Sequence, residues 1–309
     1  MNNTLVIPNL TEGFDIGNAY ANFSNMKFAT KVKIGKKLEL DKRIEVHQVN
    51  YNGVDYVVGD GKAVMGEFKY STDAYKLCVL TAIALKSGRK RNVRAKICLG
   101  LPIMNFERKV EEVRSIIESW GVQELAIKDE NTGKYNTYTI EIVDLKFFIE
   151  GALPVLNEDM SHQLTIDIGG GTINVVEWED MSPVNYTTLD ASITNMYLNI
   201  AEYLNYNYGG SFTTGDIEKI ICKEKTVIPI NQVPVDISAI YLMVQEFVDG
   251  VVSSIEEAKF KVGQVEKISI FGGGVYSTFK YFTKHYTHAE QVKDAQFVNS
   301  KILRLVAKM

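Results

Sequence analysis

The sequence is poor in cysteine and has no long apolar run. Its 309 residues include three cysteines, Cys78, Cys98 and Cys222, and no Cys-x-x-Cys pair. An odd count without such a pair argues against a disulfide framework and fits a reducing compartment such as the cytoplasm. Each cysteine lies in an apolar run, which predicts a buried packing role. No stretch approaches the roughly 18 apolar residues that a membrane-spanning helix needs, so no membrane partner is expected.

An excess of charge of one sign is also missing. The net charge is −4, with 46% apolar and 23% charged residues, which is typical of a globular protein and gives no reason to expect bulk nucleic-acid binding. A basic run between Lys86 and Lys96 lacks interleaved aromatics, so a solvated loop is favoured, with a protein contact as the alternative to DNA binding. His285 and His288 form a His-x-x-His pair without nearby cysteines, which favours an exposed loop over a metal site.

The chain length favours two domains over one. The first half alternates hairpins and helices, with a strong hairpin signal at Asn52-Gly53 and a helix between the capping residues 71–73 and Gly88. The second half opens on a strand-like run and continues through three helical patterns. It then gives a strand, a glycine triplet and a closing amphipathic helix.

The most informative feature is the stretch LTIDIGGGTINVVEW, residues 164–178, where an aspartate and three glycines interrupt an apolar strand pattern. A shorter version, FDIGNAYANF, occupies residues 14–23. The two aspartates, Asp15 and Asp167, lie about half the chain apart. One such motif alone is usually a plain hairpin turn, but two at this spacing predict related halves that each present an acidic hairpin to a shared cleft.

The residue types in these turns suit phosphate chemistry. A glycine turn lets backbone N–H groups approach an anion without a Cβ in the way. An aspartate at a strand end can hold Mg²⁺ directly or through its waters. A third glycine turn, FGGGVYS at residues 271–277, would let a base or ribose lie against the backbone. The sequence contains no P-loop motif, and DIGGGTIN does not have the spacing of a dinucleotide fingerprint.

In order along the chain, the segments FDIGNAYANF, YVVGDGKAV, ICLGLPI, FFIEGALPVL, LTIDIGGGTINVVEW, ISIFGGGVYST and DAQFVNSKIL resemble motifs of the actin, Hsp70 and sugar-kinase superfamily. Within it, the chain resembles bacterial actin-like proteins of the ParM/StbA plasmid-partition type. The resemblance implies an α/β, actin-like (ribonuclease H-like) two-domain ATPase fold with a duplicated mixed-sheet core and an interdomain nucleotide cleft. It implies domain I at 1–160, domain II at 161–290, and a C-terminal helix at 291–309 that returns to domain I.

The resemblance also implies roles for individual residues. Glu150 would orient or activate the attacking water, and Asp15 and Asp167 would be catalytic acids that hold Mg²⁺ largely through water. Contacts to the nucleotide would come from the first loop (Gly17, Asn18), the second loop (Gly169, Gly170, Gly171, Thr172), the adenosine turn (Gly272, Gly273, Gly274) and a base or ribose contact (Glu218, Lys219). One departure is Asn22, which stands where the family often has a lysine or another polar phosphate ligand. Charge stabilisation would then depend more on Mg²⁺ and backbone donors.

The implied function is a nucleotide-driven filament. It would bind and hydrolyse ATP with Mg²⁺, release ADP, and assemble head-to-tail in the cytoplasm to separate plasmid copies; GTP stays open as the base. Its partners would be further copies of itself and a DNA-binding adaptor at a plasmid centromere, without direct nucleic-acid contact. The alternatives are a small-molecule, sugar-type kinase, for which no sugar-binding motif is seen, and an Hsp70-like module, for which no substrate-binding domain follows the closing helix.

Overall fold

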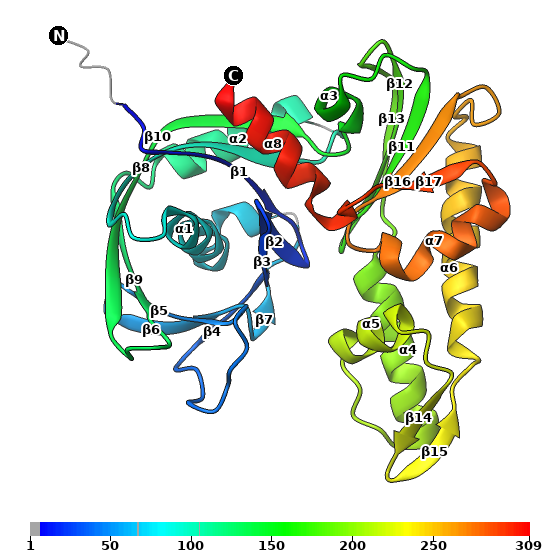
Figure 1. The fold of residues 1–309 in the computed structure, drawn as a ribbon, viewed down its shortest axis with the longest axis horizontal. Helices are drawn as coiled ribbons and strands as arrows, with labels where there is room; N and C mark the ends of the chain where they lie inside the picture. Colours follow the sequence, from blue (N-terminus) through cyan, green and yellow to red (C-terminus); the bar gives the residue numbers. More distant parts are fainter. Residues whose placement is uncertain (1–6, 67, 105) are drawn as a thin grey trace. The chain divides into compact units, whose positions relative to one another are not determined.

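The computed structural model describes residues 7–66, 68–104 and 106–309, and these form two compact units (Figure 1). One unit runs up to Glu150 and also contains Phe297–Met309; the other is Gly151–Gln296. The first division falls before the predicted boundary at 160/161, because Thr165 Oγ1 donates to Gly151 O (3.0 Å) and ties the start of this segment to the second unit. The second division falls after 290/291, because Gly272 N donates to Ala295 O (3.1 Å).

The first unit is built on one mixed sheet. Its strands are β1 (Leu10–Ile16), β2 (Tyr20–Phe23), β3 (Met26–Ala29), β4 (Lys31–Ile34), β5 (His47–Tyr51), β6 (Val54–Val58), β7 (Lys62–Ala63), β8 (Asn92–Leu101), β9 (Gln123–Lys128) and β10 (Tyr135–Ile149). They are ordered β3-β2-β1-β8-β10-β9-β5-β6-β4-β7. Strands β1, β8 and β10 are parallel, and the other pairs are antiparallel. The hairpin expected at Asn52-Gly53 joins β5 to β6.

Helix α1 (Asp73–Ser87) forms the centre of this unit, with the sheet curling round it (Figure 1). Thr72 caps its start by accepting from Tyr75 N, and Gly88, with φ 62°, ends it. The sequence pattern predicts one apolar face, whereas the structure buries residues on every side. A helix that is apolar all round is stable only when it is enclosed in this way. Helix α2 (Phe106–Glu118) is amphipathic and buries Val113 and Ile117.

The closing helix α8 (Val298–Lys308) belongs to the first unit and packs on β1 and β8. Gly13 allows this close contact, because a Cβ there would lie 2.1 Å from Arg304 N. Next to it, the fully buried Glu12 carboxylate pairs with Lys86 of α1 (2.9 Å) and Arg304 of α8 (3.5 Å). A buried charge needs such partners to offset its desolvation.

The second unit has a smaller mixed sheet, ordered β13-β12-β11-β16-β17. Its strands are β11 (Gln163–Ile168), β12 (Ile173–Glu179), β13 (Ser182–Leu189), β16 (Lys267–Phe271) and β17 (Ala289–Gln291), with a separate hairpin of β14 (Val227–Ile230) and β15 (Val233–Asp236). Its helices are α3 (Leu153–Asn157), α4 (Ile193–Tyr208), α5 (Thr214–Cys222), α6 (Ile240–Glu257) and α7 (Val275–His285). The sequence pattern did not indicate β13, β14 or β15, whose side chains are largely exposed or half-buried.

The two sheets repeat one topology. In each unit an antiparallel meander is joined, through its first strand, to two further parallel strands: β3-β2-β1-β8-β10 corresponds to β13-β12-β11-β16-β17. The predicted duplicated mixed-sheet core is therefore confirmed, and the fold is mixed α/β. The two acidic hairpins, β1–β2 and β11–β12, occupy equivalent places in the two sheets.

Three expectations about composition can be compared with this fold. Cys78 and Cys98 are buried as predicted, but Cys222 is exposed because it ends α5 at the surface. The basic run is not an open loop throughout, since β8 begins at Asn92 and several of its cations have intrachain partners: Lys86 with Glu12, Arg94 with Glu141 and Lys96 with Asp144. Among the described residues, no helix has the length and hydropathy to cross a membrane.

The pH dependence of stability should reflect His47, which begins β5 and packs its ring edge-on against Phe28. Burial lowers the pKa of His47 from 6.5 to about 4, with the charge of Lys37 acting in the same direction and Glu130 opposing it. The folded chain therefore binds fewer protons than the unfolded chain between these values. We expect stability to be fully present above pH 6.5 and to fall by up to about 3 kcal/mol as the pH drops to 4.

Urea denaturation at several pH values in this window measures the effect. The difference between wild type and His47→Gln isolates the His47 contribution from that of the carboxylates. A His285→Gln control, which leaves His47 intact, should keep the wild-type slope. Parallel curves for wild type and His47→Gln would contradict the assignment.

Candidate functional site

The first acidic hairpin is β1–β2, in which Asp15 lies directly opposite Asn22. Asn22 Nδ2 donates to Asp15 Oδ2 (3.1 Å), and both side chains are buried. Asn22 Oδ1 is also buried and has no hydrogen-bond donor among the described residues. The turn is closed by Gly17 N donating to Tyr20 O (3.0 Å). The hairpin therefore presents buried oxygen acceptors, one of them unsatisfied, at the end of β1.

The second hairpin, β11–β12, repeats this arrangement. Asp167 lies opposite Asn174, and Gly169 N donates to Thr172 O (3.0 Å) across the turn. Asp167 is buried at the end of β11, and Asn174 Oδ1 accepts from Thr188 of β13 (2.8 Å). Asn22 is thus the positional counterpart of Asn174. Asn22, which departs from the usual family motif, therefore belongs to one of two matching Asp–Asn pairs.

The turn glycines Gly169–Gly171 are held from outside the hairpin. Gly170 O accepts from Ser192 Oγ (2.7 Å) and from Thr194 N (3.1 Å) at the start of α4. Ser192 also caps that helix, so a single residue fixes both the turn and the helix start. Both contacts are made through the carbonyl oxygen of Gly170, so they hold the turn without using the N–H group of that residue.

Lys69 is the residue that sequence reasoning missed. It lies in a short 3₁₀ helix, Lys69–Ser71, ahead of α1, and its Nζ donates to Asn18 Oδ1 (2.9 Å) and Ile16 O (3.3 Å) at the first hairpin. Desolvation lowers the pKa of Lys69, while the charges of Glu150 and Asp15 oppose that shift. The chain therefore does supply a lysine at the first hairpin, from outside the hairpin sequence. A lone lysine in the segment FKYST gives no local sign of this.

Glu150 follows the last residue of β10, and its N–H donates to Leu101 O of β8 (3.0 Å). The neighbouring strand leaves room for its side chain, since a Cβ at Gly100 would lie 3.2 Å from Glu150 Cγ. The charge of Glu150 acts to raise the pKa of Lys69 and the pKa of Tyr70. The first unit thus gathers the predicted residues Asp15, Asn18 and Glu150 around Lys69.

In the second unit the third glycine turn packs directly on the second hairpin. Gly272 has φ 86°, and a Cβ there would lie 2.5 Å from both Asp167 Oδ1 and Ile168 O. Gly274 N donates to Ile168 O (3.0 Å), and a Cβ on Gly274 would lie 2.4 Å from Ile168 Cγ2. Gly273 faces Gln296 instead. Gly272 and Gly274 therefore let two strand ends approach each other and fix the Asp167 carboxylate.

The weaker predictions, Glu218 and Lys219, lie on α5. That helix packs on α7, which begins directly after the third glycine turn. Glu218 is half-buried and Lys219 is exposed. These two residues belong to the same unit as Gly272–Gly274, on a neighbouring helix rather than on the turn itself.

A Gly272→Ala variant should show how tightly this turn is packed. The positive φ and the clash with Asp167 Oδ1 should together lower the free energy of unfolding by about 1–3 kcal/mol or more. Gly250→Ala is a matched control, because Gly250 lies within α6 with no atom near its Cβ position, and alanine is the better helix former. Urea denaturation of the two variants measures the difference; equal stability would contradict the packing argument.

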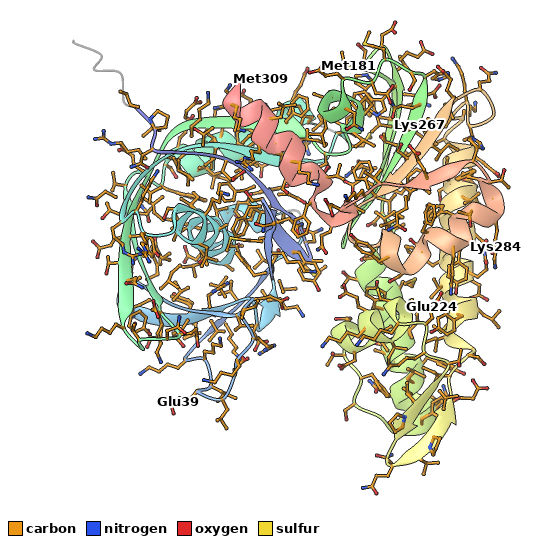
Figure 2. All side chains as sticks on the ribbon, viewed as in Figure 1. Glu39, Met181, Glu224, Lys267, Lys284 and Met309 are labelled. Carbon is orange, nitrogen blue, oxygen red and sulfur yellow. The ribbon has the colours of Figure 1, made fainter. Side chains whose placement is uncertain are left out.

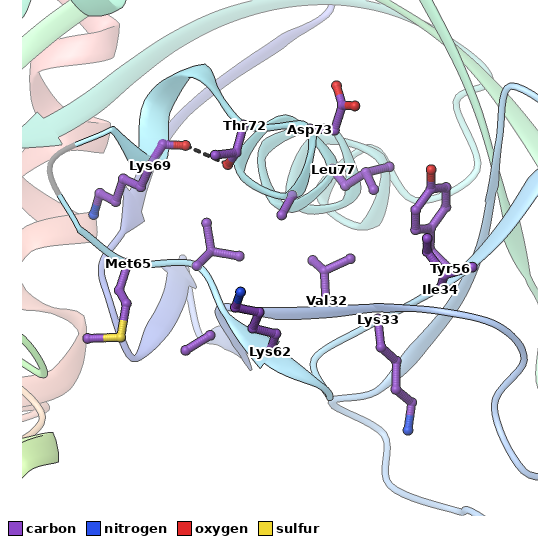
Figure 3. A pocket seen from close by; sticks show the side chains of 13 residues that line it. Val32, Lys33, Ile34, Tyr56, Lys62, Met65, Lys69, Thr72, Asp73 and Leu77 are labelled. Atoms are coloured by element: carbon purple, nitrogen blue, oxygen red, sulfur yellow. Dashed lines mark hydrogen bonds between the residues drawn. The ribbon is translucent and has the colours of Figure 1, made fainter.

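The first unit also contains a cavity of about 380 Å³ between β4, β6, β7 and the start of α1 (Figure 3). Its walls are mainly apolar, with Lys33, Lys62, Lys69 and Asp73 among the lining residues. Of the residues gathered at the first hairpin, only Lys69 lines it. Lys69 therefore both lines the cavity and contacts the acidic hairpin.

The donor set of each hairpin suits a magnesium ion. Mg²⁺ prefers oxygen ligands and keeps several of its waters, so it is commonly held by one or two carboxylates. Asp15 and Asp167 supply such carboxylates, and the unsatisfied Asn22 Oδ1 is a further oxygen beside Asp15. No thiol and no imidazole is among these residues, which agrees with a hard cation.

Two repeated mixed sheets, each carrying an Asp–Asn hairpin, form the core of an actin-like fold. Residues 13–152 match the family model described as the N-terminal domain of actin-like proteins, and solved actin homologs match the fold of this chain over nearly its whole length. No curated protein sequence matches the chain.

Three solved structures illustrate the likeness in fold. An archaeal actin homolog in complex with ADP matches with a TM-score of 0.77 at 15% identity, covering 97% of this chain and 99% of that one. A 15-stranded ParM filament from Clostridium botulinum gives 0.78 at 17% identity, with 97% and 99% covered. The Alp12 filament structure gives 0.65 at 18% identity, with 96% and 99% covered.

Proposed function

We propose that this chain binds and hydrolyses a nucleoside triphosphate, ATP in the first instance, with both acidic hairpins contributing residues. The observation that carries the proposal is the duplicated Asp–Asn hairpin: Asp15 with Asn22 and Asp167 with Asn174 at equivalent ends of two repeated sheets. Support comes from the archaeal actin homolog solved with ADP, which has the same fold.

Phosphoryl transfer to water needs positioning and charge neutralisation more than covalent chemistry. In our proposal Asp15 and Asp167 hold Mg²⁺ largely through its waters. When bound, the ion neutralises charge on the phosphates. The backbone N–H groups of Asn18, Gly170, Gly171 and Thr172 approach the phosphate oxygens. Those of Gly17 and Gly169 close the two turns by donating to Tyr20 O and Thr172 O. Glu150 orients the attacking water and accepts its proton.

Lys69 adds a cation that the sequence interpretation lacked. Its Nζ already lies at the first turn, on Asn18 Oδ1 and Ile16 O, so a small rotation of a flexible side chain would bring it to a phosphate oxygen. Glu150 and Asp15 favour its charged form against the cost of desolvation. We assign Lys69 the role of phosphate ligand that the first hairpin itself does not supply. Gly272–Gly274 and, on α5, Glu218 and Lys219 would contact the nucleoside.

We also propose that the chain assembles into head-to-tail filaments, as relatives solved in filaments do. The connection between β4 and β5 supports this, because it buries a charged side chain and exposes apolar ones (Figure 2 labels Glu39 within it). The Lys37 side chain is only 5% exposed and donates to the carbonyls of Arg43 and Val46. Leu40, in contrast, is 91% exposed, and Ile34, Leu38 and Ile44 are also exposed. Exposed apolar residues on a braced loop are typical of an interface.

Heterologous contacts of this kind form open filaments when their rotation does not close. In a cell, such a filament would segregate plasmid DNA in the cytoplasm through an adaptor protein bound at a plasmid centromere. This finer proposal rests on the resemblance of the ordered motifs to ParM/StbA proteins.

Sedimentation of the purified protein with and without Mg-ATP tests the proposal. We expect pelleting and light scattering only with nucleotide, and loss of both in an Asp167→Asn variant. Nucleotide binding without any nucleotide-dependent assembly would overturn the filament proposal and leave the ATPase. Turnover that rises on adding a sugar would favour the kinase alternative, which is the reason to include a sugar screen in the same assay.

A further inference from the structure

A cluster of one histidine and two glutamates lies at the other end of the second hairpin from Asp167. It consists of His162, directly before β11, and Glu177 and Glu179 at the end of β12, next to the turn at which Figure 2 labels Met181. His162 Nε2 lies 2.8 Å from Glu177 Oε1 and 3.8 Å from Glu179 Oε1. The three ligand atoms lie within 4.8 Å of one another.

The strand register explains why the three side chains meet. Gln163 pairs with Trp178 and Leu164 pairs with Glu177, so His162 comes opposite Glu179 and diagonal to Glu177. Residues two apart on a strand share a face, and diagonal neighbours lie within reach of long side chains. A register irregularity between Glu177 and Trp178, where β12 pairs with β13, adds local twist at the cluster. The grouping therefore follows from backbone pairing.

The charge at this cluster is poorly balanced. The Glu177 side chain is 1% exposed, yet in the part of the chain that the structure describes no lysine or arginine forms an ion pair with it. Among the described residues, Glu177 contacts His162 Nε2 and, at 3.4 Å, accepts from the backbone N–H of Lys261. Glu179, 48% exposed, adds a second carboxylate beside the same imidazole. Burying a carboxylate without a full cationic partner is costly.

We propose that His162, Glu177 and Glu179 form a binding site for a divalent transition-metal ion of the Zn²⁺ type. One imidazole and two carboxylates are ligands that Zn²⁺ takes, with bonds of about 2.0–2.2 Å. A tetrahedron with such bonds separates its ligand atoms by about 3.3 Å, between the two observed distances of 2.8 and 3.8 Å. A divalent charge balances the two carboxylates. Because Glu179 is half-exposed, a further coordination position on the ion would be open to water.

This site is separate from the nucleotide site. His162 and Asp167 are five positions apart along extended strand, which corresponds to about 17 Å at about 3.3 Å per residue. The imidazole favours a transition metal over Mg²⁺, whose preferred ligands are oxygens. The bound ion would clamp the open end of the hairpin whose closed end carries Asp167, and it would stabilise the folded chain by linkage.

The test is titration of the untagged, full-length protein with Zn²⁺ in excess Mg²⁺ and without nucleotide, followed by calorimetry and thermal unfolding. We expect one saturable site per chain and a rise in Tm. Glu179→Gln, at a half-exposed position where misfolding is not expected, and His162→Ala should each weaken Zn²⁺ binding at least tenfold. With Co²⁺ as probe, the wild type should give the visible absorption of a low-symmetry site, and His162→Ala should lose it.

His285→Ala is the matched control. His285 Nε2 also lies 2.7 Å from a carboxylate, that of Asp249, but no second acid joins that pair in a cluster among the described residues. This variant and Asp167→Asn should bind Zn²⁺ like the wild type. The proposal is overturned if the wild type shows no saturable binding, or if His285→Ala weakens binding while Glu179→Gln does not. In those cases the cluster is only an ion pair that joins two strand ends.

Discussion

A Glu150→Gln variant should bind ATP with an affinity within a few-fold of the wild type and hydrolyse it about 100- to 10,000-fold more slowly. This is the range that a positioned general base contributes. The substitution keeps the size of the side chain beside Gly100 and removes only the carboxylate that would accept a proton from water. Single-turnover phosphate release, with binding of a fluorescent ATP analogue measured separately, distinguishes the two effects.

Glu141→Gln is the control for that variant. Glu141 lies on the same strand, β10, but its side chain is 43% exposed and pairs with Arg94 at 3.6 Å, so its loss should leave turnover unchanged. Because removing Glu150 also removes a charge that supports protonated Lys69, ATP affinity should be compared over a range of pH. A parallel loss of binding and hydrolysis would show that Glu150 acts on the phosphates and not on the water.

Replacing Leu40 and Ile44 together by aspartate should abolish nucleotide-dependent pelleting. Burial of an exposed leucine or isoleucine at an interface is worth about 1.5–3 kcal/mol each. Losing two of them, with charges introduced, should raise the critical concentration for assembly by at least about 100-fold. Both side chains are 87% or more exposed in the chain by itself, so the fold and ATP binding should be retained. Sedimentation over a range of protein concentrations measures the shift.

The comparison for this double variant is Val122→Asp. Val122 is 59% exposed in the same unit but follows α2, away from the β4–β5 connection. Normal assembly of Val122→Asp together with loss of assembly in the double variant would assign the contact to this loop. Normal assembly of the double variant would place the filament contact elsewhere.

Much of the fold was predictable because its signals are local. Asn52-Gly53 marks the β5–β6 hairpin, since both residues adopt positive φ, and Thr72 and Gly88 mark the ends of α1. The pair of aspartate–glycine motifs half a chain apart predicted the duplicated sheet. Less predictable were β13 to β15, because strands that bury little apolar surface have a weak alternation of polarity.

The residues of the candidate site also fall into those that the sequence indicated and those that it did not. Asp15 and Asp167 were visible because acids at the ends of apolar strands are unusual in a local pattern, and Glu150 was indicated by the resemblance of its segment to a family motif. Asn22 looked like a departure, since only the strand register shows that it opposes Asp15 as Asn174 opposes Asp167. Lys69 was not visible at all, because it is 51 residues from Asn18 in sequence and reaches the turn only through the packing of α1 inside the sheet.

The sequence by itself determined where this protein has acidic glycine turns, hairpins and helices, because those features depend on neighbouring residues and their backbone preferences. Only the tertiary structure decided what faces those turns. The contacts of Gly272 with Asp167 and of His162 with Glu177 depend on sheet order and register. Lys69 reaches the first hairpin through the packing of α1 inside the sheet. A β11–β12 register that differed by one residue would have turned His162 and Glu177 to opposite faces of the sheet and dispersed that cluster.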